Sequence, residues 1–158
     1  MSRCPLRWGM QYVKRAMLLV SLALATGCGS DDDEKAAEDP APANFTEQVA
    51  LGTEVFGAHC AKCHGDAGEG TADAPPLVGA EALPLDPPSG AKVRKSQFVT
   101  VADVAEFAVE YMPGDAPGTL SEEEYFAVLA FDLMANGIDL GEQKLDADLA
   151  ASLTIPRE

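Results

Sequence analysis

Two cysteines and a histidine, Cys60, Cys63 and His64, have the spacing in this chain that best suits a chemical role, in the segment CAKCHG. In a helix the two thiols would lie about one turn apart. C-x-x-C-H is the attachment signature of c-type haem, in which two thiols bond to the vinyl groups of one porphyrin edge and the histidine ligates the iron. The pattern predicts one covalently attached haem c, anchored by Cys60 and Cys63 and ligated by His64.

Three other roles for these side chains fit the sequence less well. A redox-active C-x-x-C expects alternating strands and helices around it, and the chain shows no such alternation. A zinc site needs four ligands at workable spacing, whereas His59, Cys60, Cys63 and His64 crowd into residues 59–64. A structural disulfide across two intervening residues closes almost no loop, so it would add little stability.

A single histidine leaves the opposite side of the iron open, and Met112 is the candidate to fill that position. Pro113 cannot continue a helix and biases the residue before it toward an extended backbone, which places Met112 on a loop. An iron-ligating thioether and a methionine that fills a gap in the core are equally consistent with this position alone. We expect His59 at the surface and Met134 in the core.

The segments around these residues divide the chain into three parts. Residues 1–27 combine a positive start, an apolar run of about ten residues and small residues before Cys28, which is typical of an export signal peptide. That run is shorter than the roughly 20 residues that a membrane-spanning helix needs. Residues 28–43 form an acidic linker without aromatic side chains, which is predicted to be disordered. Residues 44–158 are expected to form one domain.

This domain is strongly acidic. It contains 20 acidic and six basic side chains, a formal charge of −14. The charge argues against nucleic acid as a partner, whereas cationic proteins remain suitable partners. Three of the basic residues, Lys92, Arg94 and Lys95, lie in the proline-rich segment 79–98, which is expected to be mostly loop. Three roles stay open for these residues: they pair with haem propionates, they form a solvated docking spot for an acidic partner, or they have neither role.

The segment LATGC resembles the lipobox of bacterial lipoproteins, whose cysteine becomes the lipidated N-terminus. The resemblance implies removal of residues 1–27, lipidation of Cys28 and tethering of the domain to a membrane through the linker. It also implies a location on the periplasmic side of a bacterial membrane, with the inner and outer membranes both open. An ordinary signal peptide followed by a chance cysteine is the alternative.

Two longer segments resemble the small class I cytochromes c. GTEVFGAHCAKCHG carries Gly52 and Phe56 at the family's spacing before Cys60, and MPGDAPGTLSEEEYFAVLAFDLMANG is similar to the family's methionine loop and last helix. The resemblance covers roughly residues 46–137. It implies an all-α class I cytochrome c fold, with three to five helices around one covalent haem. It also implies that Met112 is the sixth iron ligand and that the first and last helices cross closely at Gly52.

A third segment, APPLVG at residues 74–79, is similar to the family's G-P-x-L segment. The similarity implies that the Pro75 carbonyl accepts a hydrogen bond from the second ring nitrogen of His64, and that Leu77 packs on the haem. Such a bond would fix the orientation of the histidine ring and tune its basicity as a ligand. A simple rigid loop is the alternative for this segment.

Together these features predict an electron carrier and not an enzyme. No pair of side chains looks like a general acid and base, and the single haem on a flexible tether suits a mobile carrier between redox partner proteins. Two alternatives stay open. One is a haem-based sensor or peroxidase-like enzyme with an open sixth position, and the other is a haem subunit docked in a larger oxidoreductase.

Overall fold

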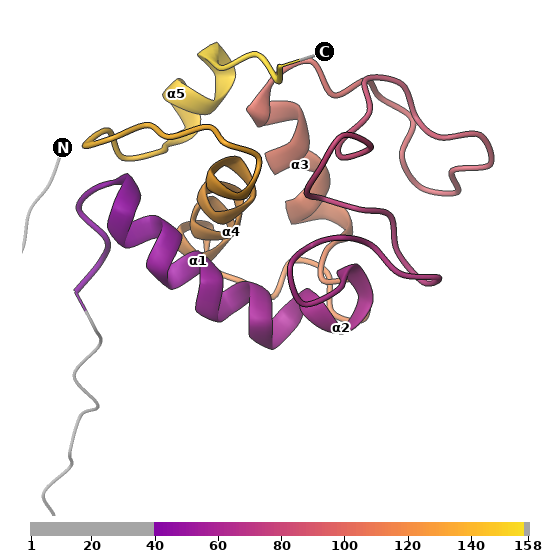
Figure 1. Cartoon of the computed structure of the whole chain (residues 1–158), viewed down its shortest axis with the longest axis horizontal. Helices are drawn as coiled ribbons and strands as arrows, with labels where there is room; N and C mark the ends of the chain where they lie inside the picture. The colour runs from indigo at the N-terminus through magenta and orange to yellow at the C-terminus, as the bar shows by residue number, and fades with distance from the viewer. Residues whose placement is uncertain (1–39, 157–158) are drawn as a thin grey trace, which may run out of the picture. The chain divides into compact units, whose positions relative to one another are not determined.

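The computed structural model describes residues 40–156, and their regular structure is helical (Figure 1). An isolated antiparallel bridge joins Thr100 to Thr154. The all-α fold is therefore confirmed. The predicted signal peptide, Cys28 and most of the predicted linker lie outside the described residues. The helices of the described part are α1 (Phe45–His59), α2 (Ala61–His64), α3 (Val101–Tyr111), α4 (Glu122–Ala135) and α5 (Ala147–Ser152).

A polar side chain caps the N-terminus of each of the longer helices. It accepts a hydrogen bond from a backbone N–H group that has no partner inside the helix. Asn44 caps α1 in this way. The S-x-x-E pattern of Ser121 and Glu124 predicts a capping box, and α4 begins with that arrangement. Thr100 and Asp103 form a second capping box at α3. Among the residues described, no helix is long and apolar enough to span a membrane.

The helices α1 and α4 cross at very close range (Figure 1). Gly52 is buried at the crossing, and a Cβ atom built on it would lie only 2.0 Å from the backbone oxygen of Ala127. The rings of Phe56 and Phe131 pack beside the glycine with centroids 4.5 Å apart. The predicted close crossing is confirmed, and it fixes α2, which continues from α1, relative to α4.

The segment after α4 closes the core. Leu145, Ala150 and Ile155 are buried with Phe45 and residues of α3 and α4 in one apolar cluster. A buried side chain on α1, Gln48, donates to the backbone oxygen of Leu145 at 2.8 Å and accepts from its N–H at 2.7 Å. Helix α5 and its flanking residues therefore pack against α3 and α1.

The segment 79–98 is loop, as predicted, and Arg94 holds it together. Its guanidinium is buried, donates to the backbone oxygens of Pro84, Leu85 and Ser96, and lies over the ring of Phe98. The predicted role of Arg94 in a solvated docking spot for an acidic partner is therefore wrong, because its charged group binds backbone carbonyls inside the loop. Lys92 and Lys95 are exposed.

Candidate functional site

Cys60 and Cys63 lie at the junction of α1 and α2. Cys60 ends α1 and begins α2, with its carbonyl accepting from His64 N at 3.0 Å, so the two thiols are held one turn apart. Both cysteines are half-buried and free. Burial raises the pKa of the Cys60 thiol to about 11, with smaller contributions from the charges of Asp132 and Cys63. The Cys60 thiol is therefore protonated at neutral pH.

His64 is buried, and one of its two ring nitrogens is already engaged. Its Nδ1 lies 2.8 Å from the backbone oxygen of Pro75. Because a carbonyl only accepts, Nδ1 carries the proton and Nε2 is left with its lone pair. The N–H of Gly70 donates to the His64 carbonyl at 2.7 Å and fixes the backbone after the helix. This tautomer is the one that a histidine needs to bind a metal through Nε2.

Hydrogen bonds to Gly68 and to Asn136 hold the segment that contains Pro75 and Leu77. The N–H of Leu77 donates to the Gly68 carbonyl at 2.8 Å, and the Leu77 carbonyl accepts from Asn136 Nδ2 at 2.9 Å. Asn136 Oδ1 also accepts from Gly79 N at 3.0 Å. Leu77 is half-buried. Asn136 was missed by the sequence analysis, although an asparagine before a glycine at a helix end is a usable signal.

Met112 ends α3 in an extended conformation, with φ −122° and ψ 151°. Its carbonyl accepts a hydrogen bond of 2.6 Å from the hydroxyl of Tyr125, and that hydroxyl accepts from Gly118 N at 3.1 Å. Tyr125 is buried on α4. One tyrosine thus binds both ends of the loop from Met112 to Gly118, a role that the sequence did not indicate.

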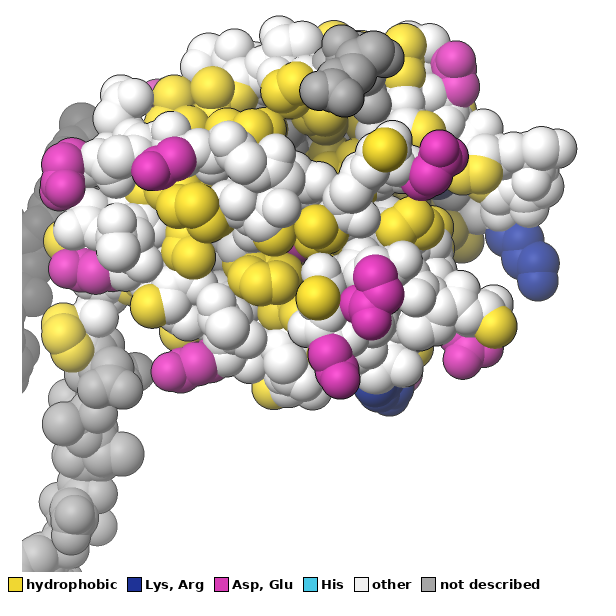
Figure 2. All heavy atoms as spheres, viewed as in Figure 1, with side chains coloured by type: hydrophobic (Ala, Val, Ile, Leu, Met, Phe, Trp, Pro, Cys, Tyr) yellow, Lys and Arg dark blue, Asp and Glu magenta, His cyan; other side chains and the backbone are white. Residues whose placement is uncertain are grey.

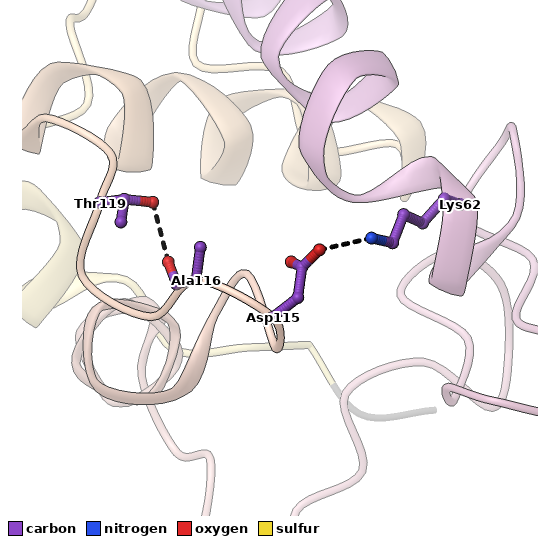
Figure 3. A network of polar contacts seen from close by, with 4 residues as sticks. All are labelled: Lys62, Asp115, Ala116 and Thr119. Atoms are coloured by element: carbon purple, nitrogen blue, oxygen red, sulfur yellow. Dashed lines mark hydrogen bonds and ion pairs between the residues drawn. The ribbon is translucent and has the colours of Figure 1, made fainter.

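An ion pair brings this methionine loop next to the cysteine segment (Figure 3). Lys62, between the two cysteines, binds the carboxylate of Asp115, three residues after Met112. Within the loop, the hydroxyl of Thr119 donates to the Ala116 carbonyl at 2.8 Å. Lys62 and Asp115 are well exposed, so the pair stabilises the loop only weakly. Its geometry nevertheless shows that the loop and α2 are neighbours.

A cavity of about 710 Å³ lies between the segment 78–85, α3, α4 and the C-terminal segment. This volume is in the range of ligand pockets. Figure 2 shows hydrophobic side chains at the floor of a hollow in the surface. Most lining residues are apolar, including Leu83, Val104, Leu129 and Leu133. Asp132 also lines the cavity, and its charge acts on the Cys60 thiol, although neither cysteine is among the lining residues.

Asp132 is the unexpected residue of this cavity. No role for it follows from the sequence. Its side chain is 5 % exposed, and Oδ1 has no hydrogen-bond partner among the described residues. Burial raises the pKa of this carboxyl group to about 8.

The free thiols one turn apart and the histidine with one open ring nitrogen fit a covalently attached haem. Within residues 40–156, no group of three or more His, Cys, Asp or Glu side chains is arranged as a zinc site would require. The helical fold and this arrangement define a c-type cytochrome domain. The family model described as "Cytochrome C oxidase, cbb3-type, subunit III" matches residues 47–131, more than half of the chain. The chain belongs to this family of haem c proteins, which confirms the predicted cofactor and fold.

Among solved structures, the chain is similar to one described as "Crystal Structure of the Sulfane Dehydrogenase SoxCD from Paracoccus pantotrophus". The two are 26 % identical, with a TM-score of 0.53, and the match covers 85 % of this chain and 69 % of the other. No curated protein matches the chain. A cytochrome c domain performs haem-based electron transfer, so this general part of the predicted function is confirmed.

Proposed function

We propose that the protein is a monohaem electron carrier that passes single electrons between redox proteins. Cys60 and Cys63 bond the haem, His64 binds the iron through Nε2, and Met112 is the sixth ligand. The observation that carries the proposal is the hydrogen bond of 2.8 Å between His64 Nδ1 and Pro75 O, beside two free thiols. It leaves Nε2 as the basic nitrogen of the ring.

In this proposal the chain's own residues do four things. Each cysteine S–H adds across a vinyl double bond, which forms a thioether without oxidation or reduction. The Pro75 carbonyl keeps the proton on His64 Nδ1 and fixes the ring. Leu77 excludes water from the haem face. Met112 supplies a thioether that favours the reduced iron. The haem, when bound, supplies the iron that alternates between its ferric and ferrous states.

We further propose that Cys28 carries the lipid that tethers the domain on the periplasmic side of a bacterial membrane. One acyl chain binds a membrane only marginally, so stable anchoring requires the several chains of a bacterial lipoprotein. Acidic side chains on the visible face (Figure 2) suit a redox partner with a basic docking surface. Fractionation tests the tether, because Cys28→Ser should move the protein from membranes to the soluble periplasmic fraction. Wild-type protein found free in that fraction would contradict it.

A docked haem subunit of a larger oxidoreductase is the second candidate. The family description names an oxidase subunit, and the similar structure is described as a sulfane dehydrogenase. A mobile carrier would elute at the mass of one chain after gentle solubilisation, whereas a docked subunit would elute in a stable complex with its partner.

Mass spectrometry and absorption spectra test the haem assignment. In a host with haem-attachment machinery, the mature protein should keep one haem after acid–acetone extraction. His64→Ala should remove the low-spin spectrum, whereas His59→Ala, a matched control at the chain's other histidine, should leave it unchanged. His59 is exposed, so its loss disturbs no packing. A wild-type mass equal to the bare polypeptide would refute the proposal.

The sixth ligand has its own matched control, because Met112 and Met134 are the methionines that follow residue 27. Met112→Ala should leave the haem attached, lower the potential and open the iron to cyanide or carbon monoxide. Met134→Leu should do none of this, since a volume-conserving swap usually costs less than about 1.5 kcal/mol. If cyanide binds wild type and Met112→Ala equally well, a sensor or peroxidase-like protein with an open sixth position becomes the better description.

A further inference from the structure

Neither the fold nor electron transfer alone explains why Asp132 is buried. This residue lies on α4 with 5 % of its surface exposed, and its Oδ1 has no hydrogen-bond partner among the described residues. A buried carboxylate without a donor is strongly unfavourable in its charged form. Such a group is retained in the folded state as the neutral acid, or with a positive charge nearby.

Among the described residues 40–156, the lining of the cavity around Asp132 contains no Lys or Arg. Among the described residues, the titratable groups related to Asp132 are Cys60, whose pKa responds to its charge, and Glu81, which lines the same cavity from the segment 78–85. Uncharged residues line the cavity from α3 and the C-terminal segment, namely Val101, Val104, Ile155 and Pro156. Glu81 is exposed and carries the same sign of charge, so it offers no compensation.

The porphyrin ring of a haem would offer no N–H group as the missing donor, because its nitrogens bind the metal. What it brings to the neighbourhood of Cys60 is a positive charge that is larger when the iron is oxidised. In the haem-loaded protein, the negative charge of Asp132 would therefore be compensated by the oxidised iron or by a bound proton. Adding one electron to the iron would replace the first kind of compensation by the second.

We infer that Asp132 is a proton-binding site coupled to electron transfer, which binds one proton on reduction and releases it on oxidation. The inference rests on the proposed function, because it needs a haem held at Cys60 and Cys63. In the balanced step, the Asp132 carboxylate binds one proton from solvent while the site receives one electron from a donor protein. The summed charge of the site then stays constant.

The coupling has a defined signature in the reduction potential. Burial raises the pKa of Asp132 to about 8, oxidised iron lowers it, and reduction raises it. Between the pKa of Asp132 in the oxidised protein and its pKa in the reduced protein, the reduction potential should fall as the pH rises, because reduction then consumes a proton. The limit for one proton per electron is about 59 mV per pH unit, the one-electron equivalent of a tenfold change.

The test is a potentiometric titration of the full-length haem protein at several pH values on both sides of neutrality. Wild type should show a falling potential, and Asp132→Asn should lose most of the slope, because the amide has nearly the same shape but does not titrate. Glu81→Gln is the matched control and should keep the slope, since Glu81 lines the same cavity but is exposed. Titrating haem propionates would give a slope in all three proteins.

Equal slopes in wild type and Asp132→Asn, or a flat potential in wild type, would overturn the inference. If Asp132→Asn does not fold, the reduced-minus-oxidised infrared spectrum of wild type decides. The C=O stretch of a carboxylic acid should appear on reduction and shift in heavy water, and its absence refutes the coupling. A protein without attached haem refutes the proposed function itself, whereas an attached, reversibly reduced haem with a flat potential refutes only the role of Asp132.

Discussion

The close crossing of α1 and α4 predicts that Gly52→Ala destabilises the protein although alanine is the better helix former. The added Cβ would lie 2.0 Å from the oxygen and 2.6 Å from the carbon of the Ala127 carbonyl, and 3.1 Å from Phe131 Cβ. An ordinary contact begins at 3.4 Å, so the two helices must separate by about 1.4 Å. Both conflicting atoms of Ala127 belong to the backbone, which cannot turn aside as a side chain can.

The magnitude follows from two opposing effects. Alanine gains about 1 kcal/mol of helix propensity over glycine. Overpacking a core costs typically 1–3 kcal/mol and sometimes more, and the helix separation would also loosen the contact between Phe56 and Phe131. We expect Gly52→Ala to lower the free energy of unfolding by about 2 kcal/mol. Gly57→Ala, on the same helix with no atom within 4 Å of its Cβ, should raise it by roughly 0.5–1 kcal/mol.

Urea unfolding followed by circular dichroism measures both variants. The midpoints should move in opposite directions while the slope of the free energy against urea stays constant. If Gly52→Ala proves as stable as Gly57→Ala, the close crossing is wrong, and the placement of α2 and the cysteines against α4 is wrong with it.

Three further predictions concern the site. Tyr125→Phe removes the hydroxyl that binds Met112 O, so it should lower the free energy of unfolding by about 1–2 kcal/mol and speed cyanide binding to the oxidised protein; unchanged cyanide kinetics would contradict a role in holding the loop. Because burial raises the pKa of Asp132 from 3.8 to about 8, the folded state binds the extra proton between these values. Stability should therefore fall as the pH rises through this window, by up to about 1.4 kcal/mol per pH unit, and pH-dependent thermal unfolding should show this decline in wild type but not in Asp132→Asn. Asp115→Asn, which weakens the exposed pair with Lys62, should cost at most about 1 kcal/mol in urea unfolding, and a loss above about 2 kcal/mol would show that the pair does more than its exposure allows.

Signals confined to a few neighbouring residues could be predicted from the sequence. The capping box of Ser121 and Glu124 depends on atoms within one helical turn, and the C-x-x-C-H spacing depends on the pitch of one helix. The fold class and the haem c cofactor followed from such local patterns and are confirmed. The roles of Cys60, Cys63, His64, Met112, Pro75 and Leu77 are predictions that the experiments above will decide.

The sequence by itself determined which side chains could hold a haem, because covalent spacing and helix pitch fix their separation wherever the helix lies. Only the tertiary structure decided what surrounds them. Gln48 meets Leu145 across 97 positions of the chain, Tyr125 reaches back to Met112, and Arg94 turns inward onto carbonyls of its own loop. The isolation of Asp132 in the cavity depends on α3, the segment 78–85 and the C-terminal segment together. A pattern of neighbouring residues contains no information on which distant segments exclude water from a side chain, and that exclusion sets its charge.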